Sequence, residues 1–182
     1  MNADSWKIDD VHSGIHFTVK HLVVATVRGQ FRRFGAELAI DPADLTRSSV
    51  VVTIDAASID TGSAQRDGDL RSANFLDADK FSSLTFRSRK IELAANDGYR
   101  IVGDLTIRGV TREVALDTQF GGFVVDPWGN RRAGFTARAS IQRSDFGMVW
   151  NQALEAGGVV VSDRVDIAIE VEALSQASRA VA

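Results

Sequence analysis

Apolar and polar residues alternate with a period of two along most of this chain. The last such stretch is the clearest, because Val165, Ile167, Ile169 and Val171 are separated by single residues that are mostly charged. This period places alternate side chains on opposite faces of a β-strand, and strands with one apolar face are typical of antiparallel sheets. About eight stretches follow the pattern and predict strands: residues 11–21, 36–40, 50–54, 84–86, 99–108, 114–120, 133–141 and 165–171.

Short turn motifs separate several of these stretches. Asn96-Asp97-Gly98 is typical of a tight hairpin, and residues 108–111 and 126–130 have the glycine and proline content of turns. Two longer segments break the alternation. Residues 60–81 contain a short helical pattern at 65–72, and residues 146–160 are rich in glycine and carry Trp150.

Half-buried strands in one domain must cover their apolar faces, either as two stacked sheets or as one sheet closed into a barrel. Closure also removes exposed strand edges, so we predict an eight-stranded antiparallel barrel. We expect the two segments that break the alternation to cover the ends of this barrel.

The interior of an eight-stranded barrel is either filled by side chains or holds one small ligand. Gly103 and the alanines at positions 133, 137 and 139 have the parity of inward-facing residues, and their small size favours free space. Packing against large neighbours is the alternative. His21 shares its parity with Phe17 and Val19, so it either bonds a backbone group in the core or anchors the polar end of a ligand.

Composition narrows the classes of function. The 182 residues carry a net charge of −3 and no cysteine, which excludes disulfides and thiol catalysis. The basic residues form only small groups, which argues against nucleic-acid binding. No apolar run approaches the roughly 20 residues that span a bilayer.

The two ends of the chain lead to further expectations. Residues 1–10 lack the apolar core of a secretory signal, so we expect a cytoplasmic protein, or a periplasmic or secreted one whose signal has been removed. We expect one domain over residues 1–174 and a flexible tail over residues 175–182. Whether the chain forms a homodimer is left open.

Three short motifs suggest chemistry, and each has a plainer interpretation. Residues 60–63 match the catalytic turn of aspartic proteases, but a single copy would need a symmetric dimer, and a strand-ending turn explains the motif as well. His12 and His16 lie about 13 Å apart on a strand, too far to share a metal ion. Asp67 and Asp69 form either a catalytic carboxylate pair or part of an ion-pair network. We expect no metal ion and no cofactor.

Several segments occur in a characteristic order and spacing from about residue 6 to residue 172: Trp6-x-Ile8-Asp9 with His12-Ser13-x-Ile15-x-Phe17-x-Val19-Lys20-His21, Val27-Arg28-Gly29-x-Phe31, Ser58-Ile59-Asp60-Thr61, Arg66-Asp67-x-x-Leu70-Arg71-Ser72, Gly103-x-Leu105-Thr106-Ile107-x-Gly109-Val110-Thr111, and Ser144-Asp145-Phe146-Gly147 with Trp150. In this combination the chain resembles the YceI-like family of lipocalin-like, polyisoprenoid-binding proteins. It departs from the family at Asp69, where the family usually has histidine.

The resemblance implies an extended eight-stranded antiparallel lipocalin-like β-barrel with one short helical element. It further implies a long tunnel that holds an isoprenoid chain or a similar amphiphile, and it makes residues 58–61 ordinary family sequence rather than part of a protease. On this basis we expect Phe17, Val19, Leu105, Ile107, Phe135 and Ile141 to line the tunnel. Phe31, Phe75, Phe81, Phe146 and Trp150 are expected at its mouths, with His21 and Asp69 making polar contacts.

The leading hypothesis is therefore a non-catalytic carrier or sequestering protein for a polyisoprenoid, an isoprenoid quinone or a fatty amphiphile. The alternative is an enzyme of the same fold, such as a cyclase or isomerase, that folds and positions an apolar substrate. His21, Asp67 and Asp69 would then be the acid–base groups.

Overall fold

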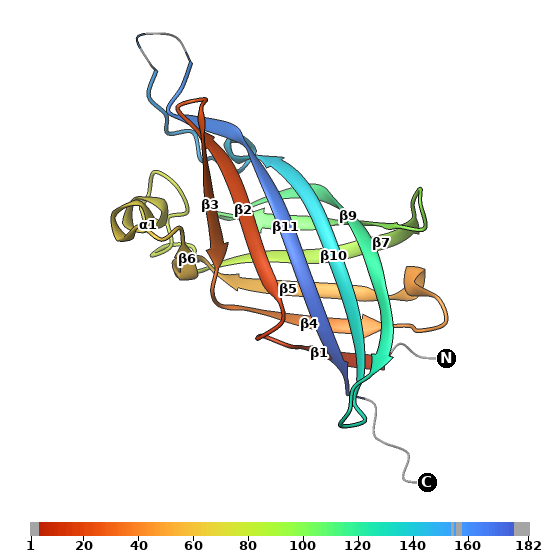
Figure 1. The fold of residues 1–182 in the computed structure, drawn as a ribbon. Coiled ribbons are helices and arrows are strands. Elements are labelled where there is room, and N and C mark those ends of the chain that lie inside the picture. The colour runs from red at the N-terminus through yellow and green to blue at the C-terminus, as the bar shows by residue number, and fades with distance from the viewer. Residues whose placement is uncertain (1–3, 154, 156–157, 177–182) are drawn as a thin grey trace.

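The computed structural model describes residues 4–153, 155 and 158–176. Strands account for most of these residues, as the alternation predicts (Figure 1). The strands are β1 (Asp4–Ile8), β2 (Gly14–His21), β3 (Ala25–Phe31), β4 (Phe34–Ile40), β5 (Ser49–Asp55), β6 (Ile59–Asp60), β7 (Ser83–Leu93), β8 (Tyr99–Ile107), β9 (Val110–Val125), β10 (Arg131–Gln142) and β11 (Val161–Ser175).

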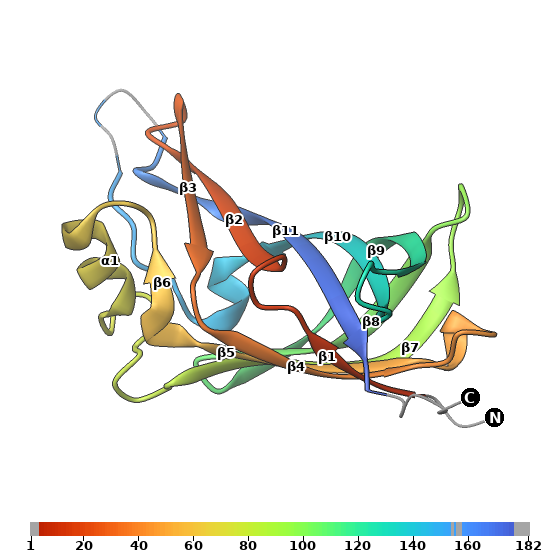
Figure 2. The same cartoon turned by 60° about the horizontal axis from the view of Figure 1, so that its bottom comes forward.

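The sheet closes on itself as an antiparallel barrel of eight strands, which confirms the predicted fold. Closure is made by β1, which pairs with β4 on one side and with the end of β11 on the other. Around the ring the order is β1, β4, β5, β7, β8, β9, β10 and β11, and β2 extends from β11 with β3 and β6 beyond it. Figures 1 and 2 show that β2, β10 and β11 run at a steep angle to β4, β5 and β7, and Figure 1 shows them crossing in front. The barrel is therefore flattened into two crossing faces.

The pairing register of β10 and β11 explains why the alternation of apolar residues predicted the inner face correctly. Phe135 pairs with Val171, Ala137 with Ile169, and Ile141 with Val165 across β10 and β11, so the apolar residues of both strands share the inner face. The register between β9 and β10 shifts between Gly134 and Phe135, where β9 carries the extra residue Gly121, and similar irregularities occur in β7 and β11. Such bulges bend the strands and increase their twist, which helps a sheet to close.

The predicted turns are present. Asn96 and Asp97 have φ of 56° and 55°, and Arg108 and Gly109 have 52° and 73°, the left-handed values that two-residue hairpin turns require. In the β9–β10 turn, the carboxylate of Asp126 accepts hydrogen bonds from the backbone N–H groups of Trp128 and Asn130.

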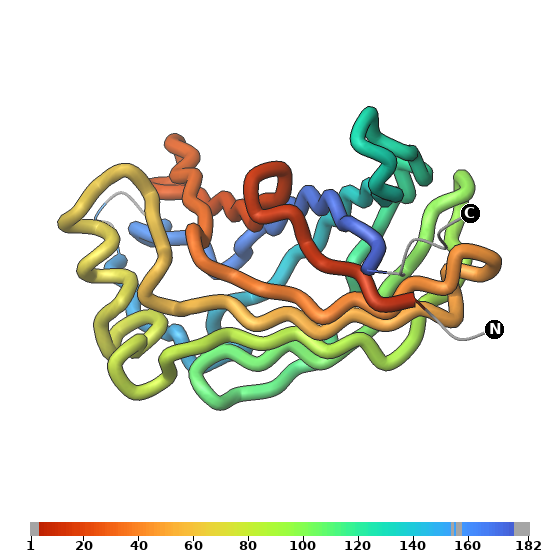
Figure 3. Tube along the Cα trace, turned by 90° about the horizontal axis from the view of Figure 1, so that it is seen from below, coloured from red at the N-terminus to blue at the C-terminus, as the bar shows by residue number. Residues whose placement is uncertain are grey.

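The first of the two segments that break the alternation, residues 60–81, contains the α-helix α1 (Ala64–Arg71). Its ends lie within one residue of the predicted helical pattern at 65–72. Ser63 caps its N-terminus by accepting from the N–H of Arg66. Short 3₁₀ turns also occur: η1 (Leu45–Arg47), η2 (Ala56–Ser58) and η3 (Arg143–Phe146). Within the described part of the chain, no helix is both long and apolar enough to cross a membrane. In Figure 3, α1 lies at one end of the barrel and η1 at the other.

Two of the small inward residues, Gly103 and Ala133, do not create the free space that we expected from them. A Cβ atom on Gly103 would lie 2.6 Å from Cζ of Phe86 and 2.4 Å from the carbonyl oxygen of Arg87. Ala133 is only 1% exposed and packs in a cluster with Trp6. The expectation is therefore wrong for both positions, because aromatic neighbours occupy the space that the small residues leave.

The start of the expected tail is also too early. Ser175 is the last residue of β11, and the N–H of Gln176 donates to the carbonyl oxygen of Ser5 at 2.9 Å. Residues 177–182 of the expected tail lie outside the described residues.

Candidate functional site: an apolar barrel cavity with one polar end

The barrel encloses a cavity of about 660 Å³, within the range of small-molecule sites. Its wall is mostly aliphatic and aromatic. Each strand of the closed ring except β1 and β10 contributes at least two of these side chains. The main apolar contributors are Phe17, Val19, Phe31, Phe34, Ala36, Leu38, Val50, Val52, Ile54, Leu84, Phe86, Leu105, Ile107, Val114, Leu116, Ile141, Val165, Ile167, Ile169 and Val171.

One end of the barrel is filled by its own aromatic side chains. Phe120 lies between Phe123 and Phe135, with ring centroids 4.8 and 5.1 Å apart, and Trp6 stacks 5.7 Å from Phe123. These rings belong to a separate core cluster, which meets the cavity wall at Leu38 and Val171. The cavity therefore ends at this cluster.

The other end carries most of the polar side chains that line the cavity. Gln65, Arg66 and Asp69 come from α1, and Asn74 follows it. Phe75 and Trp150 also line this end, with ring centroids 5.5 Å apart. A ligand in this cavity would meet charged and amide groups at one end only.

Hydrogen bonds to residues 57–61, which include the short strand β6, hold α1 in place. Arg71 donates from Nε to the carbonyl oxygen of Ala57 at 2.8 Å and from Nη2 to that of Ile59 at 2.9 Å. The buried carboxylate of Asp67 accepts from the N–H of Thr61 at 2.8 Å and from its hydroxyl at 2.6 Å. The charged segment 66–71 thus contains a structural anchor, and Asp67 does not line the cavity.

Arg143 lines the cavity and was not among the predicted site residues. It is 5% exposed, and its guanidinium donates to the carbonyl oxygens of Met148 and Ser162. Burial lowers the pKa of this guanidinium. Its position had a signal in the sequence, because residue 143 continues the odd-numbered inward parity of residues 133–141.

Most of the residues that sequence reasoning proposed for the ligand site are brought together by the structure. The following line the cavity: Phe17, Val19, His21, Phe31, Asp69, Phe75, Leu105, Ile107, Ile141 and Trp150. The same reasoning missed the aromatic liners Phe34 and Phe86, which share the parity of Ala36 and Leu84 and were identifiable from it.

Three proposed residues lie elsewhere. Phe135 faces inward as expected but belongs to the aromatic cluster at the filled end. Phe146 is 1% exposed and packs in the main core without reaching the cavity. Phe81 packs against Gly109 in the β8–β9 turn, where a Cβ atom would lie 3.0 Å from its ring. Parity placed Phe135 on the inner face but gave no depth along the barrel. Phe81 and Phe146 lie outside the strands, where no alternation indicates the direction of a side chain.

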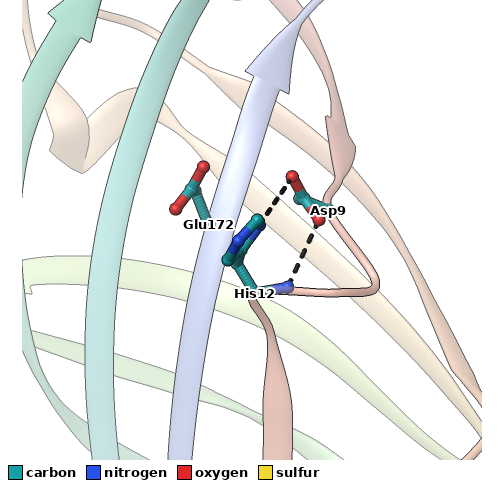
Figure 4. A group of neighbouring side chains, drawn as sticks. All are labelled: Asp9, His12 and Glu172. Carbon is teal, nitrogen blue, oxygen red and sulfur yellow. Dashed lines mark hydrogen bonds and ion pairs between the residues drawn. The ribbon is translucent and has the colours of Figure 1, made fainter. Parts of the chain in front are cut away.

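A second group of polar residues lies outside the cavity. Asp9, His12 and Glu172 place potential metal-ligand atoms within 4.8 Å of one another, and Figure 4 shows His12 turned towards Asp9. Arg132, however, donates to Asp9 at 2.9 Å, to Asp126 at 2.8 Å and to Glu172. Its guanidinium already supplies the positive charge that a metal ion would bring to these carboxylates, so we interpret the group as an ion-pair network.

Comparison with known proteins places the chain in one family. The YceI-like domain profile matches residues 6–173. A UPF0312 protein from Vibrio cholerae is 37% identical over 177 residues, which cover 96% of this chain and 89% of that protein. The crystal structure of Burkholderia cenocepacia BcnA superposes with a TM-score of 0.79 at 25% identity, covering 91% of this chain and 98% of BcnA.

A polyisoprenoid-binding domain from Saccharophagus degradans has the same fold, with a TM-score of 0.68 at 16% identity over 94% of this chain and 99% of that domain. The residues matched by the family profile, 6–173, contain nearly all of the strands that form the barrel and its cavity. The chain belongs to the YceI-like family.

Proposed function

We propose that this protein binds one long apolar molecule inside its barrel and carries or sequesters it. The observation on which this rests is the cavity of about 660 Å³, apolar along its length and polar at one end. This arrangement suits an amphiphile with a long tail and a small head group, such as a polyisoprenoid, an isoprenoid quinone or a fatty acid. The description of the Saccharophagus degradans neighbour as a polyisoprenoid-binding domain supports the same class of ligand.

The free energy of binding comes from burial of the tail. Ten methylene groups moved from water into the cavity contribute about 8 kcal/mol, and ordering of the flexible tail opposes part of this gain. The polar residues at the α1 end then orient the head group more than they hold the ligand. A carrier of this kind tolerates related tails, because the wall makes only non-directional contacts.

A carrier role fits the polar groups better than catalysis does. Acid–base catalysis needs groups within hydrogen-bond reach of the substrate. Of the three candidates, His21 and Asp69 line the cavity, but Asp67 is bonded to Thr61 and lies outside the cavity wall, so the carboxylate pair Asp67 and Asp69 does not face a ligand together. Arg143 is bonded to backbone carbonyl oxygens.

A substitution that fills the cavity tests the proposal. Ala36 lines the cavity, and the exposed residue Glu37 follows it on β4. We expect Ala36→Phe to weaken binding of a fluorescent fatty acid by at least about tenfold, or ~1.4 kcal/mol, because the new ring occupies the space of the tail. Glu37→Phe adds the same ring outside the barrel and is expected to leave the affinity unchanged.

Lipid extraction and mass spectrometry of gently purified protein give the second measurement. We expect an amphiphile in near-stoichiometric amount in the wild-type protein and much less in Ala36→Phe. Empty wild-type protein that also fails to take up the fluorescent fatty acid or added isoprenoids would contradict the proposal.

A further inference from the structure

The turn between β2 and β3 ends in three exposed aliphatic side chains. Leu22, Val23 and Val24 are 41%, 66% and 85% exposed. The hairpin projects beyond the barrel on the same side as α1 (Figures 1 and 3). Exposed apolar residues are common one at a time, but three in a row at a protruding tip call for an explanation.

A second segment lies beside this turn and adds to the same apolar surface. The N–H of Leu22 donates to the carbonyl oxygen of Val160 at 2.9 Å, and a Cβ atom on Gly158 would lie 3.3 Å from Val23. Val159 is 40% exposed here. We call Leu22, Val23, Val24 and Val159 the apolar tip.

Turn geometry does not account for these residues. Leu22 and Val23 have φ of 50° and 64°, a conformation that favours asparagine and glycine and is a marked outlier for a β-branched side chain. An Asn-Gly pair would form the same turn with less strain. The apolar side chains at this turn thus oppose the local backbone preference and add exposed apolar surface.

The apolar tip is continuous with the wall of the cavity. His21 immediately precedes it and lines the cavity, and so do Val160, which is bonded to Leu22, and Trp150. A surface that begins at Leu22 therefore leads directly to the open, polar end of the cavity.

We propose that the apolar tip inserts into the surface of a lipid bilayer, so that the ligand passes between bilayer and cavity without crossing water. This inference rests on the proposed function. A lipid surface fits better than a protein partner, because a stable protein interface buries about 800 Å² on each side around aromatic and arginine anchors. A small convex aliphatic tip offers neither, but it can enter the boundary between head groups and acyl chains.

Binding to neutral vesicles tests the inference with a variant that preserves the fold. The double substitution Leu22→Asn and Val23→Gly removes two apolar side chains and installs the residues that the turn prefers, so a loss of binding cannot be attributed to unfolding. The control is Val124→Ser with Val125→Ser, which removes two exposed valines (60% and 66% exposed) from the β9–β10 hairpin at the filled end.

We expect wild-type protein and the control to co-sediment with phosphatidylcholine vesicles, and the tip variant to bind at least about tenfold more weakly, which corresponds to the loss of ~1.4 kcal/mol. Because residues 22–24 carry no charge, salt should have little effect. Transfer of a fluorescent fatty acid from vesicles to the protein should slow by a similar factor in the tip variant, while its affinity for the same probe in water stays unchanged.

The two proposals fail in different ways. If the probe binds the cavity in water but wild-type protein does not bind vesicles, or if the tip variant binds vesicles as well as wild type, the membrane inference is overturned and the carrier function stands. If the probe in water bound to none of the three proteins (wild type, tip variant and control), the carrier function would be rejected instead. Vesicle binding lost equally in the tip variant and the control would also overturn the inference.

Discussion

Two glycines on separate strands, Gly29 in β3 and Gly103 in β8, determine where aromatic rings lie. A Cβ atom on Gly29 would approach the ring of Phe17 to 2.3 Å, and one on Gly103 would approach the ring of Phe86 to 2.6 Å. Gly29 pairs directly with Phe17 across β2 and β3. Both rings line the cavity, so the glycines set the shape of its wall by allowing each ring to lie flat against the backbone.

We expect Gly103→Ala to destabilise the protein by about 1–3 kcal/mol, because the added methyl group overlaps both Phe86 and the carbonyl oxygen of Arg87. Gly35 in β4 is the matched control, since a methyl group added there would have no atom of a non-adjacent residue within 4 Å. Gly35→Ala should be neutral or stabilising by about 0.5–1 kcal/mol. Urea unfolding monitored by circular dichroism measures both, and equal effects would contradict this account of Gly103.

At this scale the sequence predicted which face a side chain occupies, and little more. The parity of Phe135 correctly placed it inside the barrel, and parity would also have identified Phe86 and Arg143 as inward residues. Whether an inward ring meets a ligand or another ring depends on strands distant in the chain. Phe135 contacts Phe120 of β9, a pairing that is fixed only by the register of two long strands.

The helix α1 is a short element whose position depends on a few hydrogen bonds. It buries little apolar surface of its own, and a helix of eight residues is not stable alone. Asp67 and Arg71 tie it to residues 57–61. These bonds hold the polar lining residues of α1 over the open end of the cavity.

We expect Asp67→Ala to cost about 1–3 kcal/mol, because it leaves the N–H of Thr61 without its buried acceptor. Hydrogen exchange should rise first in α1 and β6. Asp69→Ala, two residues along the same helix and exposed, is expected to change stability by less than about 0.5 kcal/mol. A uniform rise in exchange over the whole barrel in Asp67→Ala would argue against a local anchor.

Elements with a regular period were predictable, and their interruptions were not. The helix at 65–72 and the hairpin at Asn96-Asp97 were predicted from local sequence. The first predicted stretch, residues 11–21, corresponds to β2, and β1 before it was not predicted. The pairing of β1 with β4 and β11 depends on how the barrel closes. No local signal in residues 9–13 fixes that geometry.

Closure of the whole barrel brings charges from distant parts of the chain to one arginine. Arg132 in β10 bonds Asp9 beyond the end of β1, Asp126 in the β9–β10 turn and Glu172 in β11. The network lies where β1 joins β11. The hydrogen bond from Arg132 is the main reason why the pKa of the Asp9 carboxyl lies well below its ordinary value.

A lowered carboxyl pKa stabilises the folded state above the ordinary pKa of aspartate, and this contribution is lost as the pH falls towards the folded-state value. We therefore expect Arg132→Gln to be less stable than wild type near pH 7, with the difference shrinking as the pH falls below about 4. Urea unfolding over a pH series measures this difference. Lys90→Gln, which breaks an exposed pair with Glu92, should show only a small difference at any pH. A gap that stays constant down to about pH 2 would contradict the assignment to Asp9 and its neighbours.

The filled end has a consequence for how the protein distinguishes its ligands. Because Phe120, Phe123, Phe135 and Trp6 fill one end of the barrel, the depth of the cavity is fixed, and under the proposed function a tail enters from the α1 end. Tails shorter than this depth gain affinity with each added carbon, since each is withdrawn from water. Once the tail reaches the aromatic cluster, further carbons must remain outside, and the gain ceases. Under the proposed function, the depth of the cavity down to the aromatic cluster therefore sets the longest chain that can be fully buried.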